Sequence, residues 1–216
     1  MKKTLNTKNL VLMAMFAAIA YIIVALVRIP MVMFLSYEPK DVVITVCSFL
    51  FGPLSALVVS LVVSLVEMVT ISSTGPIGAL MNFLSTCCFA CVAGAIYKKH
   101  HTQRGALAGL LLGSVTMICV MLLWNWMITP LYMGVPREAV EGMLLPTFLP
   151  FNALKAGLNT SITLFVYKPL VTALRKARLI ENTAPKKGSG KPWIYLIAAL
   201  LLASCILLVL AMTGKM

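Results

Sequence analysis

The chain has 216 residues, of which 61% are hydrophobic and 11% are charged, whereas a soluble domain is about 45–50% apolar. This composition excludes an ordinary soluble protein and predicts an integral membrane protein. The formal net charge is +12. The basic residues are scattered between the apolar stretches and do not alternate with aromatic residues, so they favour a lipid surface as partner and no nucleic acid.

Seven apolar stretches follow one another along the chain, and each is typical of a membrane helix. They cover residues 10–29, 42–51, 54–72, 77–97, 106–128, 150–174 and 193–213. A spanning helix needs about 20 apolar residues, and the first stretch is longer than the apolar part of a signal peptide, so we expect it to be retained. The second is short because Gly52-Pro53 interrupts a continuous apolar run. The predicted fold class is an all-α polytopic membrane protein.

Lysine and arginine residues between these stretches predict the orientation. With the N-terminus in the cytoplasm, thirteen of them fall on the inner side and four on the outer side, as the positive-inside rule requires. The outer side then holds two proline-containing segments, 28–41 and 130–146. Loops of this length are usually functional.

A polar segment near the C-terminus suggests three parts of the chain. We expect a six-helix membrane-embedded core at 1–178, a basic cytoplasmic linker at 179–192 and an accessory seventh transmembrane helix at 193–216. Gly188, Gly190 and Lys191 imitate part of a phosphate-binding loop, but prolines occupy two of its defining positions. The sequence therefore predicts that this chain does not hydrolyse ATP.

Residues that would indicate catalysis or metal binding do not form recognisable motifs. The six cysteines lie in apolar stretches, where cysteine behaves as a small hydrophobe. Cys88 and Cys91 lack a second pair of ligands at metal spacing, and no motif pairs a serine with a base. We predict neither an enzyme nor a metal or cofactor site.

Polar residues recur at helical spacing inside two of the apolar stretches. Asn152, Lys155 and Asn159 stand at i, i+3 and i+7 and therefore share one face of a helix. In residues 54–72, two serines and Glu67 form a similar stripe. An ionisable group inside a span costs at least about 2.5–3.5 kcal/mol, so it normally has a partner or borders a cavity.

Two interpretations of these groups stay open. In the first, Glu67 and Lys155 neutralise one another and the amides join helices together. In the second, Asn82 and Asn125 complete a pocket in which amides and nearby aromatic residues such as Trp124 hold a flat heteroaromatic ligand. A single carboxylate does not suit a proton relay, and no ring of like charges indicates a channel. We favour the pocket.

Several segments resemble one family of membrane proteins, the riboflavin-specific S components of energy-coupling factor (ECF) transporters. They are FLSYEPKDVVI (34–44), FLFGPLSALVVSLVVSLVEM (49–68), STGPIGALMNFLST (73–86), LLWNWMITPLYMGVPRE (122–138) and LPFNALKAGLNTSITLFVYKPLV (149–171). The resemblance covers about residues 8 to 180, which is nearly the whole expected six-helix core. The seventh apolar stretch lies outside the six-helix pattern.

This resemblance implies a bacterial plasma-membrane protein that captures riboflavin from the outside. Its implied partners are a transmembrane coupling protein and two cytoplasmic ATPases, with riboflavin as the transported ligand. The implied substrate-binding residues are Leu35, Tyr37, Glu67, Asn82, Asn125, Asn152 and Lys155. The first three line the pocket near the outer loop, whereas Asn125, Asn152 and Lys155 meet the ring and its polar edge.

A pair of small residues in the first stretch, Ala14 and Ala18, permits close approach of another helix. The resemblance implies that this stripe is the docking surface for the coupling protein. Three rival functions stay open from the sequence. They are an S component for another vitamin such as thiamine or a pterin, a stand-alone facilitator or channel that works without ATPases, and a structural membrane protein with no ligand.

Overall fold

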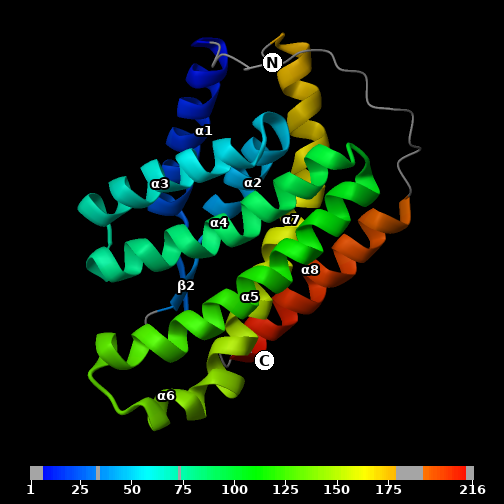
Figure 1. Ribbon diagram of the computed structural model, residues 1–216. Coiled ribbons are helices and arrows are strands. Elements are labelled where there is room, and N and C mark those ends of the chain that lie inside the picture. Colours follow the sequence, from blue (N-terminus) through cyan, green and yellow to red (C-terminus); the bar gives the residue numbers. More distant parts are fainter. Residues whose placement is uncertain (1–6, 33–34, 73, 179–191, 213–216) are drawn as a thin grey trace.

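The computed structural model describes residues 7–32, 35–72, 74–178 and 192–212 (Figure 1). Within them the chain forms a bundle of α-helices with one short β-hairpin and one π-helical turn. The elements in chain order are α1 Thr7–Leu26, β1 Ile29–Val32, β2 Leu35–Tyr37, α2 Lys40–Phe51, α3 Pro53–Thr70, α4 Gly75–Lys99, α5 Gln103–Met133, α6 Arg137–Met143, the π-helix η1 Leu144–Phe148, α7 Leu149–Lys176 and α8 Pro192–Met212.

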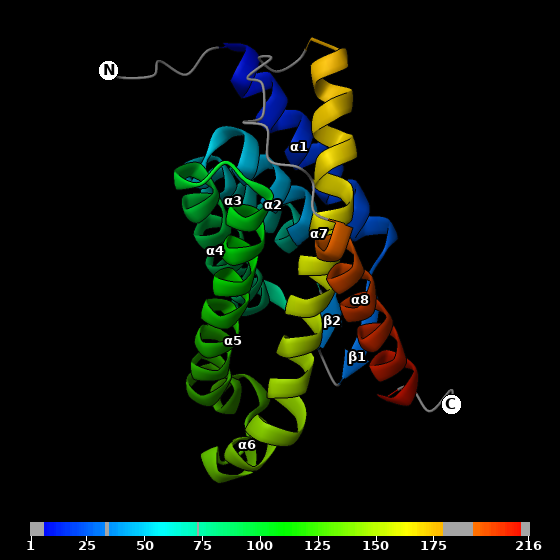
Figure 2. The same ribbon diagram turned by 90° about the vertical axis from the view of Figure 1, so that its right-hand side faces the viewer.

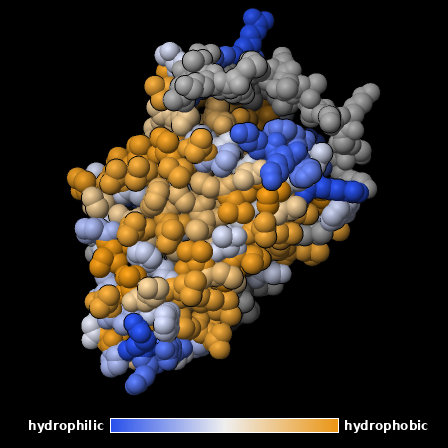
Figure 3. Space-filling model, in the orientation of Figure 1, coloured by the Kyte–Doolittle hydropathy of each residue, from blue (hydrophilic) through white to orange (hydrophobic). Residues whose placement is uncertain are grey.

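The helices confirm the all-α membrane fold. Among the described residues, α1, α3, α4 and α5 are long and apolar enough to cross a membrane. Helix α2 has only 12 residues and ends at Gly52, whose φ of 98° lies in the region that favours glycine. Figure 3 shows hydrophobic residues over the middle of one face, with hydrophilic residues toward its two ends. This distribution suits a lipid-facing surface.

The two segments that the sequence predicts on the outer side contain more regular structure than the expected loops. Residues 28–41 include the antiparallel hairpin of β1 and β2, in which Ile29 pairs with Tyr37. Residues 130–146 include the end of α5, the short helix α6 and the beginning of η1. Helix α5 is longer than predicted because Thr102 caps its N-terminus and Gly134, with φ of 65°, ends it in a left-handed conformation.

Close helix packing brings α4 and α5 together. A Cβ atom added at Gly109 would lie 2.7 Å from the carbonyl oxygen of Ala93, and one added at Gly113 would lie 2.6 Å from that of Phe89. Glycine is therefore needed at both positions for the backbones to approach this closely. This contact sets the positions of two of the helices that carry the site.

Helix α8 lies against α7, as Figure 2 shows from the side. A Cβ atom at Gly157 of α7 would lie 2.7 Å from Sγ of Cys205 and 3.0 Å from Leu201 in α8. Cys205 also belongs to a buried cluster with Tyr37 of the hairpin and Leu154 of α7. The accessory helix thus packs directly onto the part of the core that carries the hairpin.

A cysteine introduced at Gly157 tests this placement of α8. We expect Gly157→Cys to form a disulfide with Cys205 under mild oxidation, because the two side chains would start within bonding reach. After proteolytic cleavage within residues 179–191, the two fragments should stay joined on a non-reducing gel and separate on reduction. Gly142→Cys is the control, since a Cβ there meets nothing within 4 Å. Equal joining in both variants, or none in Gly157→Cys, would contradict the packing.

Candidate functional site

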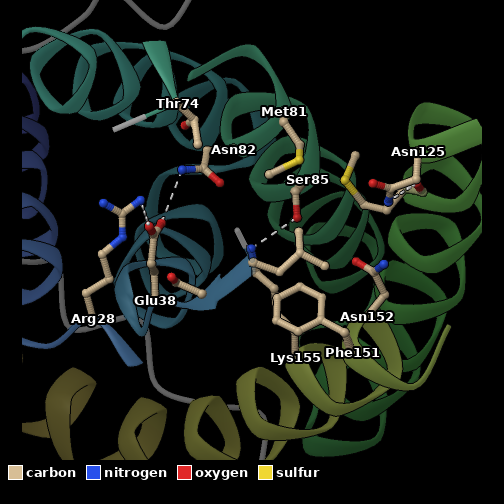
Figure 4. A pocket seen from close by; sticks show the side chains of 13 residues that line it. Arg28, Glu38, Thr74, Met81, Asn82, Ser85, Asn125, Phe151, Asn152 and Lys155 are labelled. Atoms are coloured by element: carbon tan, nitrogen blue, oxygen red, sulfur yellow. Dashed lines mark hydrogen bonds and ion pairs between the residues drawn. The ribbon is translucent and has the colours of Figure 1, made fainter. Parts of the chain in front are cut away.

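A cavity lies among α4, α5, α7 and the β1–β2 hairpin (Figure 4). Its empty space, including the open solvent at its mouth, is about 470 Å³. It is lined by Arg28, Leu35, Ser36, Glu38, Thr74, Met81, Asn82, Ser85, Met121, Asn125, Phe151, Asn152 and Lys155. Apolar and sulfur-containing side chains therefore face a small number of amides and charges.

Two buried amides form one end of the cavity, as Figure 4 shows. Asn125 of α5 donates from Nδ2 to the carbonyl of Met121 at 2.7 Å, and its Oδ1 accepts from the Thr129 hydroxyl at 3.0 Å. Asn152 of α7 donates from Nδ2 to the carbonyl of Phe148 at 2.8 Å. Each amide group has two N–H donors. One donor of each is held by the helix, and both amides line the cavity.

The π-helical turn η1 lies directly before α7 and therefore close to Asn152. In η1 the backbone N–H of Leu149 bonds to the carbonyl of Leu144, five residues earlier. Such turns insert one extra residue into a helix and frequently occur at functional sites. Asn152 bonds to the carbonyl of Phe148, the last residue of η1. The turn and the amide together set how α7 begins beside the cavity.

Lys155 lies in the middle of the cavity in Figure 4, between the amide end and the charged end. Its Nζ is 3.2 Å from Oδ2 of Asp41 and donates to the Ser85 hydroxyl at 3.3 Å. The Lys155 side chain is 5% exposed and that of Asp41 is fully buried. The ammonium group is therefore neutralised by a carboxylate of α2 and still reaches the cavity.

Glu38 organises the opposite, charged end of the cavity. Its Oε1 is 2.9 Å from the Arg28 guanidinium, and its Oε2 is 2.8 Å from Nζ of Lys40. The Asn82 amide donates to the same Oε2 at 3.3 Å. Arg28 also donates to the carbonyl of Ile71 at the end of α3. One carboxylate thus ties the hairpin to α2 and α4 at the rim of the cavity.

The suggestion that Glu67 and Lys155 pair with one another is wrong. Lys155 pairs with Asp41, and Glu67 pairs with Lys40. The charge pattern of the sequence predicts that Lys40 and Asp41 lie on the outer side, but both are buried at the start of α2. The reason is that the hairpin folds back into the bundle and carries these charges inward, where each needs a partner of opposite sign.

The structure brings most of the predicted substrate-binding residues together. Leu35, Asn82, Asn125, Asn152 and Lys155 all line the cavity. Tyr37 and Glu67 are buried beside it but do not belong to its described lining. Burial, and then the nearby Asp41 carboxylate, raise the pKa of Tyr37, and this phenol donates to Oδ1 of Asn159 at 3.1 Å.

Sequence reasoning missed Arg28, Glu38 and Ser85 as cavity residues. Arg28 and Glu38 lie in a segment that the sequence predicts to be an outer loop. Only an alternation of apolar and polar residues along the hairpin strands could have indicated that one face of the hairpin is buried. Ser85 stands one helical turn after the predicted Asn82, so helical spacing was a usable signal for it.

The small residues predicted for docking lie on the outside of the bundle. Ala14 and Ala18 are exposed, whereas Phe16 and Ala20 of the same helix are buried against the core. Neighbouring apolar residues Met15 and Ile22 are also exposed. Helix α1 therefore presents a smooth apolar surface away from the cavity.

Comparisons with known proteins agree with this architecture. Residues 8–167 match the model of the family described as ECF transporter, substrate-specific component. The chain is 26% identical to riboflavin transporter RibU of Staphylococcus aureus over 79% of this chain and 94% of that protein. It is 24% identical to riboflavin transporter FmnP of Bacillus subtilis over 81% of this chain and all of that protein.

A solved structure gives the same result for the fold. The S component of a bacterial ECF transporter superposes with a TM-score of 0.68 at 26% identity, covering 78% of this chain and 98% of that one. The family match spans most of the chain, including α1 to α5 and the site-bearing part of α7. The chain is therefore a member of the family of substrate-specific components of ECF transporters.

Proposed function

We propose that this S component binds riboflavin from the extracellular side for uptake driven by ATP that partner subunits hydrolyse. The observation that carries the proposal is the cavity in which Asn125, Asn152 and Lys155 lie together beside Phe151. The two relatives named as riboflavin transporters support the choice of ligand. A flavin ring has an apolar body and a polar edge of alternating donors and acceptors, which this lining matches.

The distribution of polar groups suggests how the ligand lies. The ring would pack against Leu35, Met81 and Phe151, since burial of apolar surface contributes about 25 cal/mol per Å². Its polar edge would meet the amides of Asn125 and Asn152. The ribityl hydroxyls would lie toward Glu38 and the other charged groups at the rim, which offer both donors and acceptors.

The proposed partners are a transmembrane coupling protein and two cytoplasmic ATPases. Family membership supports a role within an ECF module in general. The exposed apolar face of α1 around Ala14 and Ala18 is the proposed docking surface for the coupling protein. The charge distribution supports a cytoplasmic N-terminus in a bacterial plasma membrane, which puts the hairpin and the cavity opening outside.

The visible absorption spectrum of the detergent-purified protein tests the ligand. We expect protein from riboflavin-producing cells to be yellow and to release flavin on denaturation in a ratio near one to one. A colourless preparation that also fails to quench the fluorescence of added riboflavin would overturn the assignment and favour another vitamin.

Uptake into vesicles tests the division of labour. The chain alone should not accumulate riboflavin, whereas the complex with coupling protein and ATPases should do so only with ATP. Partner-independent passage of riboflavin would identify a stand-alone facilitator instead.

A further inference from the structure

A chain of buried hydrogen bonds runs from the outer hairpin to the centre of the cavity. The Tyr37 hydroxyl donates to Oδ1 of Asn159 at 3.1 Å, and Nδ2 of Asn159 donates to Oδ2 of Asp41 at 3.1 Å. The same Oδ2 is 3.2 Å from Nζ of Lys155. Of these four residues, only Lys155 is among those lining the cavity.

The Asp41 carboxylate is held from both sides. Its Oδ1 accepts a hydrogen bond from the Thr86 hydroxyl of α4 at 2.6 Å, while Oδ2 faces Asn159 and Lys155 of α7. Asp41 is fully buried, so its orientation is fixed by these contacts. A carboxylate this constrained also fixes the position of the cation that it binds.

Lys155 has three N–H donors. Asp41 and Ser85 take two of them, which leaves one for an acceptor in the cavity. A lysine side chain has high rotamer freedom, and without a fixed partner it loses that freedom only when the ligand binds. Because Asp41 already holds the Lys155 side chain, little further rotamer freedom is lost when the ligand binds.

We propose that Asp41 is a positioning residue that acts on the ligand through Lys155, at the end of a relay formed by Tyr37 and Asn159. The relay connects ligand binding to the hairpin, because Tyr37 packs in the cluster that includes Leu154 of α7 and Cys205 of α8. This inference rests on the proposed binding of riboflavin and extends it to residues that do not line the cavity.

A double-mutant cycle with riboflavin fluorescence quenching tests the relay. We expect Asp41→Asn to weaken riboflavin binding about tenfold in otherwise unmodified protein. In the Lys155→Met background the same change should alter the dissociation constant less than about twofold, because the residue through which it acts is gone. The double variant is charge-balanced, so it also serves as the fold control. Glu141→Gln makes the same chemical change in a carboxylate bonded to Trp126, outside the cavity, and should leave binding unchanged.

A milder variant removes only the far end of the relay. Tyr37→Phe keeps the ring in its cluster and deletes the hydroxyl, and we expect binding about two- to threefold weaker, again only when Lys155 is present. An equal loss in both Lys155 backgrounds, or no loss from Asp41→Asn and Tyr37→Phe in a protein that binds riboflavin, would overturn the positioning role alone. If the unmodified protein binds no riboflavin, the proposed ligand is overturned and this role with it.

Discussion

Riboflavin binding is expected to weaken about tenfold to a hundredfold when Asn152 is replaced by alanine, because a ligand group in the cavity loses its partner. Asn152 is 3% exposed and lines the cavity beside Phe151. Among the contacts described, its amide bonds to the carbonyl of Phe148. The loss should therefore fall mainly on binding, with the folded structure retained.

The measurement is a fluorescence titration of riboflavin together with thermal unfolding of each variant in detergent. Ser161→Ala is a matched control, since Ser161 is buried in the same helix and does not belong to the described lining of the cavity. It should leave affinity unchanged. Equal affinities for Asn152→Ala and the unmodified protein would remove Asn152 from the site. A parallel fall in affinity for Ser161→Ala would indicate a general effect of altering α7.

The second large effect is expected at Lys40, which should be essential for the fold. Its Nζ contacts both Glu38 and Glu67, and all three side chains are at most 5% exposed. Helix N-termini disfavour cations, so a lysine in the first turn of α2 depends on these carboxylates. Lys40→Met would leave buried negative charge without its partner, and we expect a loss of about 3–5 kcal/mol in the free energy of unfolding.

Thermal and denaturant unfolding in detergent measure this loss. Lys99→Met is the control, because Lys99 is exposed at the end of α4 and should change stability little. Adding Glu67→Gln to Lys40→Met removes the carboxylate left without a cation, since Glu38 still pairs with Arg28, and should restore part of the stability. If Lys40→Met unfolds like Lys99→Met, the ionic contacts contribute little, and a double variant less stable than Lys40→Met would contradict the pairing.

The polar stripe of α7 illustrates how far helical periodicity could predict the site. The spacing of Asn152, Lys155 and Asn159 places them on one inward face, and all three are buried. Periodicity is a local property, so it indicates which face of a helix is buried. It does not indicate which neighbouring element covers each residue. Asn152 and Lys155 line the cavity, whereas Asn159 bonds to Tyr37 and Asp41.

Which charged residues form ion pairs with one another depends on the hairpin. In the sequence, Glu38, Lys40 and Asp41 form a polar segment after a span and are typical of a solvated loop. Their burial arises because β1 and β2 pair and fold the segment back between α3, α4 and α7. Contacts between segments so distant in the chain follow from tertiary packing, which local residue preferences do not encode.

Composition, apolar spacing and the placement of Gly52-Pro53 were sufficient to predict a polytopic helical membrane protein, the short α2 and the inward face of α7. These features depend on the free energy of transferring each segment into lipid and on the period of the helix, and both are local. The tertiary structure alone decided that Lys155 pairs with Asp41, that Glu38 joins the cavity rim and that α8 packs against α7. Such pairings are decided by the mutual neutralisation and close packing of buried groups, which exist only once the helices are assembled.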